Sequence, residues 1–178
     1  MSLSDRLNTA IRVVPDFPKP GISFKDITPV MLDNSLVCEL VQALADPFRE
    51  AGVTKVVGIE SRGFLLGPMI AQELGAGFVM VRKKGKLPAK TTAVTYDLEY
   101  GSETIEVHHD AITGEDKLLI HDDLLATGGT AAAAASLAQE YGAHLSGFAF
   151  IVTLDFLPGR EKLAQFDVPL VSALACKD

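Results

Sequence analysis

Short apolar runs alternate with segments of helical length along most of the chain, and this alternation limits the folds that it can adopt. The runs are rich in Val, Ile, Leu and Phe and are bounded by Gly, Pro or Asp, as is typical of strands buried on both faces. Strands that alternate with helices build a parallel sheet covered by helices. We therefore predict the α/β class, with a central, mostly parallel sheet flanked by helices. The expected strands are residues 55–59, 78–81, 117–121, 147–153 and 168–172.

Three segments between these strands carry helix signals: residues 35–49, 65–74 and 130–141. Asp33 is a candidate N-cap for the first, and Pro47 is expected to kink or split it. Gly75 and Gly142 mark the ends of the other two, because glycine readily adopts the left-handed conformation that ends many helices. Consecutive alanines in the third segment favour a helix that lies close to a sheet.

Composition limits the size and the partners of the protein. The 178 residues, 48% of them hydrophobic, suffice for one well-buried domain, and we expect residues 1–178 to form it. A formal net charge of -7 disfavours nonspecific binding to nucleic acid or to an anionic membrane. Cys38 and Cys176 have neither disulfide-framework nor metal-site spacing, and the first residues do not resemble a signal peptide. We expect a cytoplasmic protein.

Two segments do not fit the alternation of strands and helices. Residues 15–29 contain four prolines, which predicts a shaped loop. Residues 83–101 mix lysines, a proline and paired threonines before an alternating stretch at 93–100. This second segment predicts a mobile flap that ends in a short strand.

The most informative segment is residues 117–130, where a buried strand runs into two aspartates, a turn of small residues and a helix. Beyond a central parallel strand, successive backbone N–H groups can converge on an anion, aided by the N-terminus of the helix that follows. Two glycines allow close approach, and two threonine hydroxyls can donate to phosphate oxygens. We expect a phosphate cradle made of Ala126, Thr127, Gly128, Gly129 and Thr130.

Asp122 and Asp123 lie just before this cradle. Their carboxylates suit the hydroxyls of a sugar attached to the phosphate or, indirectly, a magnesium ion. The glycine spacing matches neither the nucleoside-triphosphatase loop nor the dinucleotide fingerprint. The motif therefore predicts a sugar phosphate, whereas a plain turn with a capping aspartate is the structural alternative.

Residues 118–130, Leu-Leu-Ile-His-Asp-Asp-Leu-Leu-Ala-Thr-Gly-Gly-Thr, resemble the phosphoribosyl-pyrophosphate motif of the type I phosphoribosyltransferases. Residues 16–29, 58–64 and 81–101 are similar to the adenine-specific branch of that family, in family order. The resemblance implies the type I fold with an N-terminal base-binding hood at residues 1–34 and a flap at residues 83–101. It also implies transfer of a 5-phosphoribosyl group from phosphoribosyl pyrophosphate to N9 of adenine, giving AMP and pyrophosphate with Mg2+, usually in a homodimer.

Five of the 16 basic residues fall within nine positions after a predicted strand. Loss of pyrophosphate through an oxocarbenium-like transition state requires cations on the leaving group. The resemblance implies that Arg82, Lys83 and Lys86 contact pyrophosphate or its magnesium, and that Arg82 reaches the neighbouring subunit's site. We expect Lys84 and Lys90 to be solvated.

Arg62 follows the predicted strand at residues 55–59, at the edge where parallel sheets bind ligands. The resemblance implies that Arg62 contacts the substrate and that a non-proline cis peptide joins Glu60 and Ser61. An ion pair between Arg62 and Glu60 is the structural alternative.

Adenine presents a flat face and an amine edge, so its pocket needs an aromatic or apolar plate and backbone hydrogen-bonding groups. The resemblance implies that Phe24 stacks on the base while the Ser23 backbone contacts the amine edge. Lys25 stands where many relatives have arginine, and the two side chains are not equivalent. Core packing of Phe24 is the structural alternative.

Glu99 and Tyr100 end the expected flap. A partly desolvated glutamate there can hold a proton at N7 of the base, while the tyrosine donates a hydrogen bond and shields the site from water. An exposed strand end is the alternative.

The histidines do not have the spacing of a metal site. His121 stands where relatives of this family usually have a branched apolar residue, and we expect it to be packed and neutral. We expect structural or surface roles for His108, His109 and His144, and no metal held by the protein's own side chains alone.

Two other functions use the same cradle. One is a phosphoribosyltransferase for another base, which would need donors that recognise carbonyl groups. The other is a sensor that binds phosphoribosyl pyrophosphate or a purine without catalysis. The lysine cluster and the pair Glu99 and Tyr100 favour an enzyme.

Overall fold

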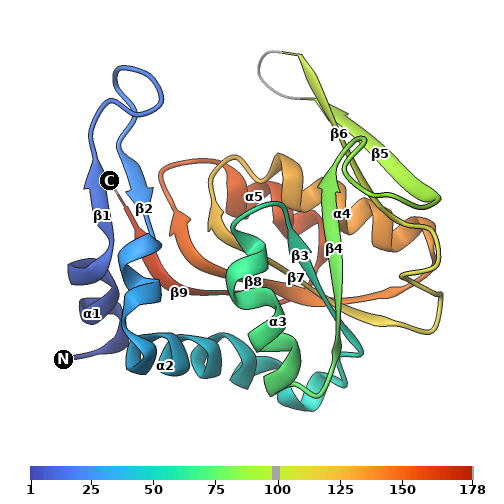
Figure 1. Ribbon diagram of the computed structural model, residues 1–178, viewed down its shortest axis with the longest axis horizontal. Coiled ribbons are helices and arrows are strands. Elements are labelled where there is room, and N and C mark those ends of the chain that lie inside the picture. Colours follow the sequence, from blue (N-terminus) through green and yellow to red (C-terminus); the bar gives the residue numbers. More distant parts are fainter. Residues whose placement is uncertain (98–100, 178) are drawn as a thin grey trace.

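A seven-stranded sheet forms the centre of the computed structural model, which describes residues 1–97 and 101–177 (Figure 1). Its strand order is β5-β6-β4-β3-β7-β8-β9. The pairs β4–β3, β3–β7, β7–β8 and β8–β9 are parallel, whereas the pairs β5–β6 and β6–β4 are antiparallel. The prediction of a central, mostly parallel sheet flanked by helices is confirmed. The strands are β3 (Lys55–Ile59), β4 (Gly77–Lys83), β5 (Thr91–Asp97), β6 (Ser102–His108), β7 (Lys117–Leu125), β8 (His144–Leu154) and β9 (Leu170–Cys176).

Helices cover both faces of the sheet and divide the core into two layers. Val56 and Leu119 face one layer together with α1, α2 and α3, whereas Val57 and Ile120 face the other with α4 and α5. Neighbouring residues of a strand thus point to opposite faces, and both faces are apolar because both are buried. The helices are α1 (Leu3–Ala10), α2 (Asn34–Ala45), α3 (Gly63–Glu73), α4 (Gly129–Glu140) and α5 (Gly159–Leu163), with 3-10 turns η1 (Thr28–Leu32), η2 (Asp46–Ala51) and η3 (Ala164–Phe166). In the described part of the chain, none of these helices combines the length and the apolar character that crossing a bilayer requires.

A small antiparallel pair stands beside the main sheet. It consists of β1 (Arg12–Val14) and β2 (Phe24–Asp26). Figure 1 shows that this pair and the β5–β6 hairpin rise at opposite ends of the sheet, on the side toward which β4 runs. The two projections therefore flank the edge of the sheet at which the central strands end.

Several boundaries differ from the predictions for physical reasons. The first predicted helix is divided at Asp46, beside Pro47, as expected, and Asp33 caps it by accepting from the Leu36 N–H. Strand β7 continues to Leu125 rather than ending at residue 121, because β8 runs beside it and pairs with it along its length. Of the predicted flap at residues 83–101, residues 91–97 form strand β5, whereas its hairpin partner β6 follows at residues 102–108. The sequence patterns did not indicate α1, the β1–β2 pair, β6 or α5.

His121 lies in the middle of the sheet and is completely buried. Its Nδ1 donates to the Ala149 carbonyl oxygen at 2.9 Å, since that oxygen can only accept. Burial lowers the pKa of His121 to about 4, although the hydrogen bond to Ala149 acts in the opposite direction. The imidazole is therefore neutral in the folded protein at neutral pH, as predicted.

Replacing His121 by valine is expected to make the folding stability depend less on pH below pH 7. The unfolded chain binds a proton near the ordinary pKa of 6.5, whereas the folded protein binds it only near 4, so folding stability falls as the pH drops through this interval. The wild type should lose about 2 kcal/mol more than His121→Val between about pH 7 and about pH 4.5. Urea unfolding at both pH values measures the difference, and parallel losses in the two proteins would contradict it.

Candidate active site

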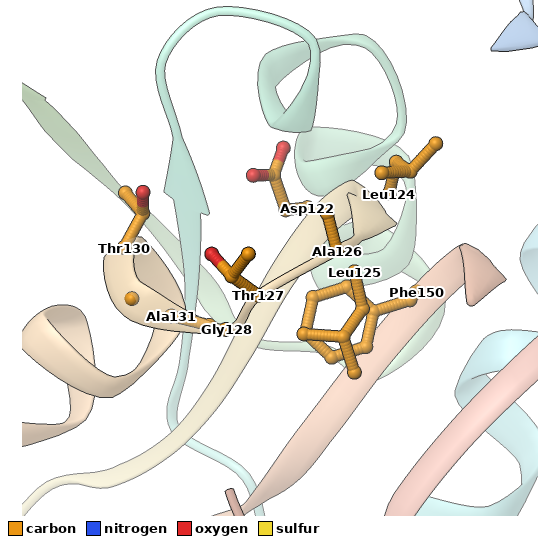
Figure 2. A pocket seen from close by; sticks show the side chains of 10 residues that line it. Asp122, Leu124, Leu125, Ala126, Thr127, Gly128, Thr130, Ala131 and Phe150 are labelled. Carbon is orange, nitrogen blue, oxygen red and sulfur yellow. The ribbon is translucent and has the colours of Figure 1, made fainter. Parts of the chain in front are cut away.

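The loop between β7 and α4 forms a hollow at the carboxyl end of the central strand (Figure 2). Gly128 is the N-cap of α4 and has a left-handed φ of 77°, which is why glycine is required there. In Figure 2 the side-chain oxygens of Asp122, Thr127 and Thr130 point to the same side of the loop. The five predicted cradle residues all line this hollow, together with Asp122, Leu124, Leu125, Ala131 and Phe150.

Helix α5 packs against the outside of the cradle, and the sequence patterns did not indicate this contact. A Cβ at Gly159 would lie 2.3 Å from the Ala126 carbonyl oxygen, so the two backbones touch. A Cβ at Gly129 would lie 3.9 Å from Lys162 Nζ, which places an ammonium group beside the start of α4. Arg160 anchors this turn by donating to Asp155 at 2.7 Å. The segment Pro158-Gly159 after a strand was the available signal.

Asp122 and Asp123 lie in the second half of β7, before its end at Leu125, and Asp123 is held by a cation from the N-terminus of α3. The Asp123 N–H donates to Asp122 Oδ1 at 2.9 Å, and Arg62 Nε lies 2.8 Å from Asp123 Oδ2. Burial, and then the negative charge of Asp123, raise the pKa of Asp122 well above its usual value. Burial also raises the pKa of Asp123, although the Arg62 guanidinium acts in the opposite direction. Ionised carboxylates are thus costly here unless a cation is near.

Arg62 also joins the β1–β2 pair to this carboxylate pair. Its guanidinium carbon lies 4.9 Å from the centroid of the Phe24 ring, a cation–π distance. The edge of Phe17 meets the same ring with a centroid separation of 5.1 Å. Ser23 is exposed just before β2, and Lys25 is half-buried within β2, next to Phe24. Phe24 is therefore half-buried against Arg62 and is not part of the buried core.

A second pocket lies beside the cradle and holds the predicted cations. Arg82 donates through Nε and Nη2 to the two carboxylate oxygens of Glu60, at 3.1 Å each. Lys83 Nζ donates to Glu103 Oε1 at 2.7 Å. The hydrogen bond from Arg82 lowers the pKa of Glu60, and Lys83 does the same for Glu103. The lining is Ile59, Glu60, Val81, Arg82, Lys83, Tyr96, Glu103, Ile105, Asp122 and Thr130.

The pairing within this pocket was predicted only in part. The expected cis peptide between Glu60 and Ser61 is present, but the alternative partner suggested for Arg62 is wrong, since Glu60 binds Arg82 instead. Lys86 takes part through its carbonyl oxygen, which accepts from Arg82 at 3.1 Å.

A buried glutamate, Glu106, fixes the turn that follows β4. It accepts from the N–H groups of Gly85, Lys86 and Leu87 at 2.9 to 3.3 Å. Sequence patterns did not indicate Glu106 or Glu103, because both lie in the unpredicted strand β6. Glu99 and Tyr100, the two residues expected at the end of the flap, lie outside the described residues.

The two pockets adjoin each other. Asp122 and Thr130 line both pockets, so the anion cradle and the cation pocket meet. The described residues contain no group of three or more histidine, cysteine, aspartate or glutamate side chains placed to hold a metal ion.

Comparison with known proteins agrees with this geometry. Residues 33–166 match the phosphoribosyl transferase domain family. The chain is a phosphoribosyltransferase, an enzyme that transfers a pentosyl group. It is 54% identical to the adenine phosphoribosyltransferase of Myxococcus xanthus over 159 residues, which are 89% of this chain and 86% of that protein. The chain therefore belongs to the adenine phosphoribosyltransferase family.

Solved structures support the same assignment. The adenine phosphoribosyltransferase of Rhodothermus marinus superposes with a TM-score of 0.92 at 54% identity, covering 97% of this chain and 98% of that chain. The enzyme of Saccharomyces cerevisiae, solved with adenine and an imino-altritol bisphosphate, gives a TM-score of 0.89 at 41% identity, covering 97% and 98% of the two chains.

Replacing Gly159 by alanine is expected to disturb the cradle from outside. The added Cβ would meet the Ala126 carbonyl oxygen at 2.3 Å and push the phosphate loop out of place. Overpacking of this kind costs about 1–3 kcal/mol, so AMP should bind roughly tenfold more weakly or worse. Gly77→Ala is the control, because its Cβ would make only ordinary contacts, the nearest at 3.7 Å. Isothermal titration with AMP tests the prediction, which fails if the two variants bind alike.

Proposed function

We propose that this chain transfers the 5-phosphoribosyl group of phosphoribosyl pyrophosphate to N9 of adenine, giving AMP and pyrophosphate, a reaction of purine salvage. The observation that carries the proposal is the junction of an anion cradle and a cation pocket at Asp122 and Thr130. A donor with a phosphate at one end and a pyrophosphate at the other fits this pair of pockets. Family membership supports adenine as the acceptor.

The 5′-phosphate is assigned to the cradle. Backbone N–H groups of residues 126–130 and the N-terminus of α4 favour a dianion there. The hydroxyls of Thr127 and Thr130 and the nearby ammonium of Lys162 add donors. Because backbone groups do most of this binding, the loop is set before the ligand arrives and little reorganisation is needed.

The pyrophosphate is assigned to the cation pocket. Arg82 and Lys83 line it and are paired with Glu60 and Glu103. Arg82 must exchange its carboxylate for a phosphate oxygen when the donor binds, whereas Lys83 has three N–H donors and can keep Glu103 while it binds the pyrophosphate. Lys86 lies on the turn next to this pocket. The leaving group gains negative charge as the bond to the anomeric carbon breaks, so cations held there stabilise the transition state more than the ground state.

Asp122 and Asp123 are assigned to the ribose hydroxyls. Both carboxyl groups have raised pKa values because they are buried, and the positive charge that develops on the ribose ring favours their ionised forms. Mg2+ would be held mainly by pyrophosphate and ribose oxygens, with Asp122 as the nearest carboxylate shared by the two pockets. When bound, the metal would neutralise charge on the pyrophosphate.

The base is assigned to the face of Phe24. Arg62 now covers that ring at 4.9 Å, too close for a base to enter between them, so the guanidinium must move aside for adenine to stack. Ser23 lies beside the ring and offers backbone groups to the amine edge, and Lys25 stands next to it. The acid–base role at N7 remains assigned to Glu99, with Tyr100 as a donor that shields the site.

We also propose that the enzyme is a cytoplasmic homodimer. Leu65 and Met69 are one helical turn apart on α3 and both are exposed, and Met80 on the neighbouring β4 is exposed as well. Such a patch suits a second copy of the chain, with Arg82 reaching the neighbouring site on release from Glu60. Sedimentation velocity tests this, and a monomer at micromolar concentration would contradict it.

The unpaired Cys38 and Cys176 suit a reducing compartment.

The direct test of the proposed function is turnover with a panel of bases. Purified protein is incubated with phosphoribosyl pyrophosphate, Mg2+ and one of adenine, hypoxanthine, guanine, xanthine or orotate, and nucleotides and pyrophosphate are separated by chromatography. We expect AMP and pyrophosphate in equal amounts from adenine alone. Reaction with another base would show that the Phe24 pocket is misassigned, and binding of the donor without any turnover would favour a sensor.

Replacing Glu99 by glutamine tests the acid–base assignment. The amide keeps the size of the side chain but cannot exchange a proton with the base, so kcat should fall by about 10²–10⁴-fold. The affinities for AMP and pyrophosphate should stay within about twofold, since an isosteric change removes no cradle or cation contact. Near-normal turnover with intact binding would rule out the role.

A further inference from the structure

The hydroxyl of Tyr96 joins the two halves of the site. Tyr96 lies on β5, and its oxygen is 2.9 Å from Thr130 Oγ1 and 3.0 Å from Glu103 Oε2. Thr130 belongs to the phosphate cradle, and Glu103 is the partner of Lys83 in the cation pocket. One side chain therefore touches a group from each half.

The direction of these hydrogen bonds follows from the available protons. Lys83 lowers the pKa of Glu103, so its carboxylate is ionised at neutral pH and can only accept. In the ligand-free site Tyr96 donates its single proton to Glu103, and its oxygen accepts the proton of the Thr130 hydroxyl. A bound 5′-phosphate can only accept, so Thr130 then turns its proton to the phosphate, and the Tyr96 proton is shared between Glu103 Oε2 and Thr130 Oγ1. Burial raises the pKa of Tyr96 to about 12, which keeps the phenol protonated.

The ring of Tyr96 is held against the cradle as well. A Cβ at Gly129 would lie 3.5 Å from both Cδ2 and Cε2 of that ring, so the ring lies along the backbone at the start of α4. Strand β5 is thereby docked on the phosphate loop. Tyr96 also lines the cation pocket, together with Asp122 and Thr130.

We propose that Tyr96 is a positioning residue for both ends of the phosphoribosyl donor. Its hydroxyl orients Thr130 at the 5′-phosphate and, through Glu103, places Lys83 at the pyrophosphate. The proposal rests on the function proposed above and adds a residue that acts through its neighbours rather than on the reacting atoms. Removing one oxygen should therefore weaken binding of two ligands that occupy different pockets.

Tyr96→Phe in the full chain tests the proposal, because phenylalanine keeps the ring that packs against Gly129. Isothermal titration measures AMP, pyrophosphate with Mg2+, and adenine. We expect AMP and pyrophosphate each to bind about three- to tenfold more weakly, the loss for one or two neutral or charge-assisted hydrogen bonds. Adenine affinity should not change. In steady state, KM for the donor should rise more than kcat falls.

Tyr141→Phe is the matched control. The Tyr141 hydroxyl donates to Thr92 Oγ1 at 2.6 Å, so it also ties the C-terminal end of α4 to β5. It touches neither the cradle nor the cation pocket as lined. We expect all three affinities of this variant to equal those of the wild type.

A double-mutant cycle separates positioning from general loosening of the fold. If Tyr96 acts through Thr130, the effects of Tyr96→Phe and Thr130→Val on AMP binding are less than additive, whereas independent defects add. Glu103→Gln with Tyr96→Phe gives the same comparison for pyrophosphate.

The outcomes distinguish this proposal from the proposed function. Wild-type turnover of adenine together with unchanged ligand binding in Tyr96→Phe would overturn the role of Tyr96 alone. Equal losses in Tyr96→Phe and Tyr141→Phe would also overturn it, since they would indicate a structural effect of β5. A wild type that binds neither AMP nor pyrophosphate would overturn both proposals.

Discussion

The contact between polypeptide backbones at the end of β7 is the constraint on which the rest of the site depends. Gly128 turns the chain with a left-handed φ, and a Cβ there would lie 3.1 Å from Gly159. Because two loops meet without side chains between them, backbone packing helps to fix the N–H groups of the phosphate loop. The aspartates, the cradle hydroxyls and the start of α4 all take their positions from this turn.

The buried carboxylates show how the fold and the chemistry are connected. Asp122 and Asp123 lie in the second half of a strand whose earlier residues, such as Leu119 and Ile120, are fully buried in an apolar core. The same burial that stabilises the strand raises the pKa of each carboxyl group. A cation is therefore needed where the strand ends, and Arg62 occupies that place while also covering Phe24.

The parts of this structure that depend on local sequence could be predicted. The strand-to-helix motif at residues 117–130, the Asp33 cap and the break at Pro47 each rest on neighbours within a few positions. Pairings across long separations could not be predicted. Glu60 meets Arg82 from 22 positions away, and Tyr96 meets Thr130 from 34. Nothing near Glu60 or Glu103 in the sequence identifies which cation each will hold, because that depends on strand order and register.

The pairs Glu60 with Arg82 and Lys83 with Glu103 also set what the empty enzyme attracts from solution. Each cation there is already matched by a carboxylate, so the pocket presents little net positive field to passing anions. Free chloride, sulfate or inorganic phosphate must displace a carboxylate that the fold already holds beside the cation, and nothing raises its local concentration. A pyrophosphate group tethered to an anchored phosphate can do so, because its second end is delivered at high effective concentration. Glu60 and Glu103 thus favour binding of a tethered pyrophosphate group over binding of free chloride, sulfate or phosphate.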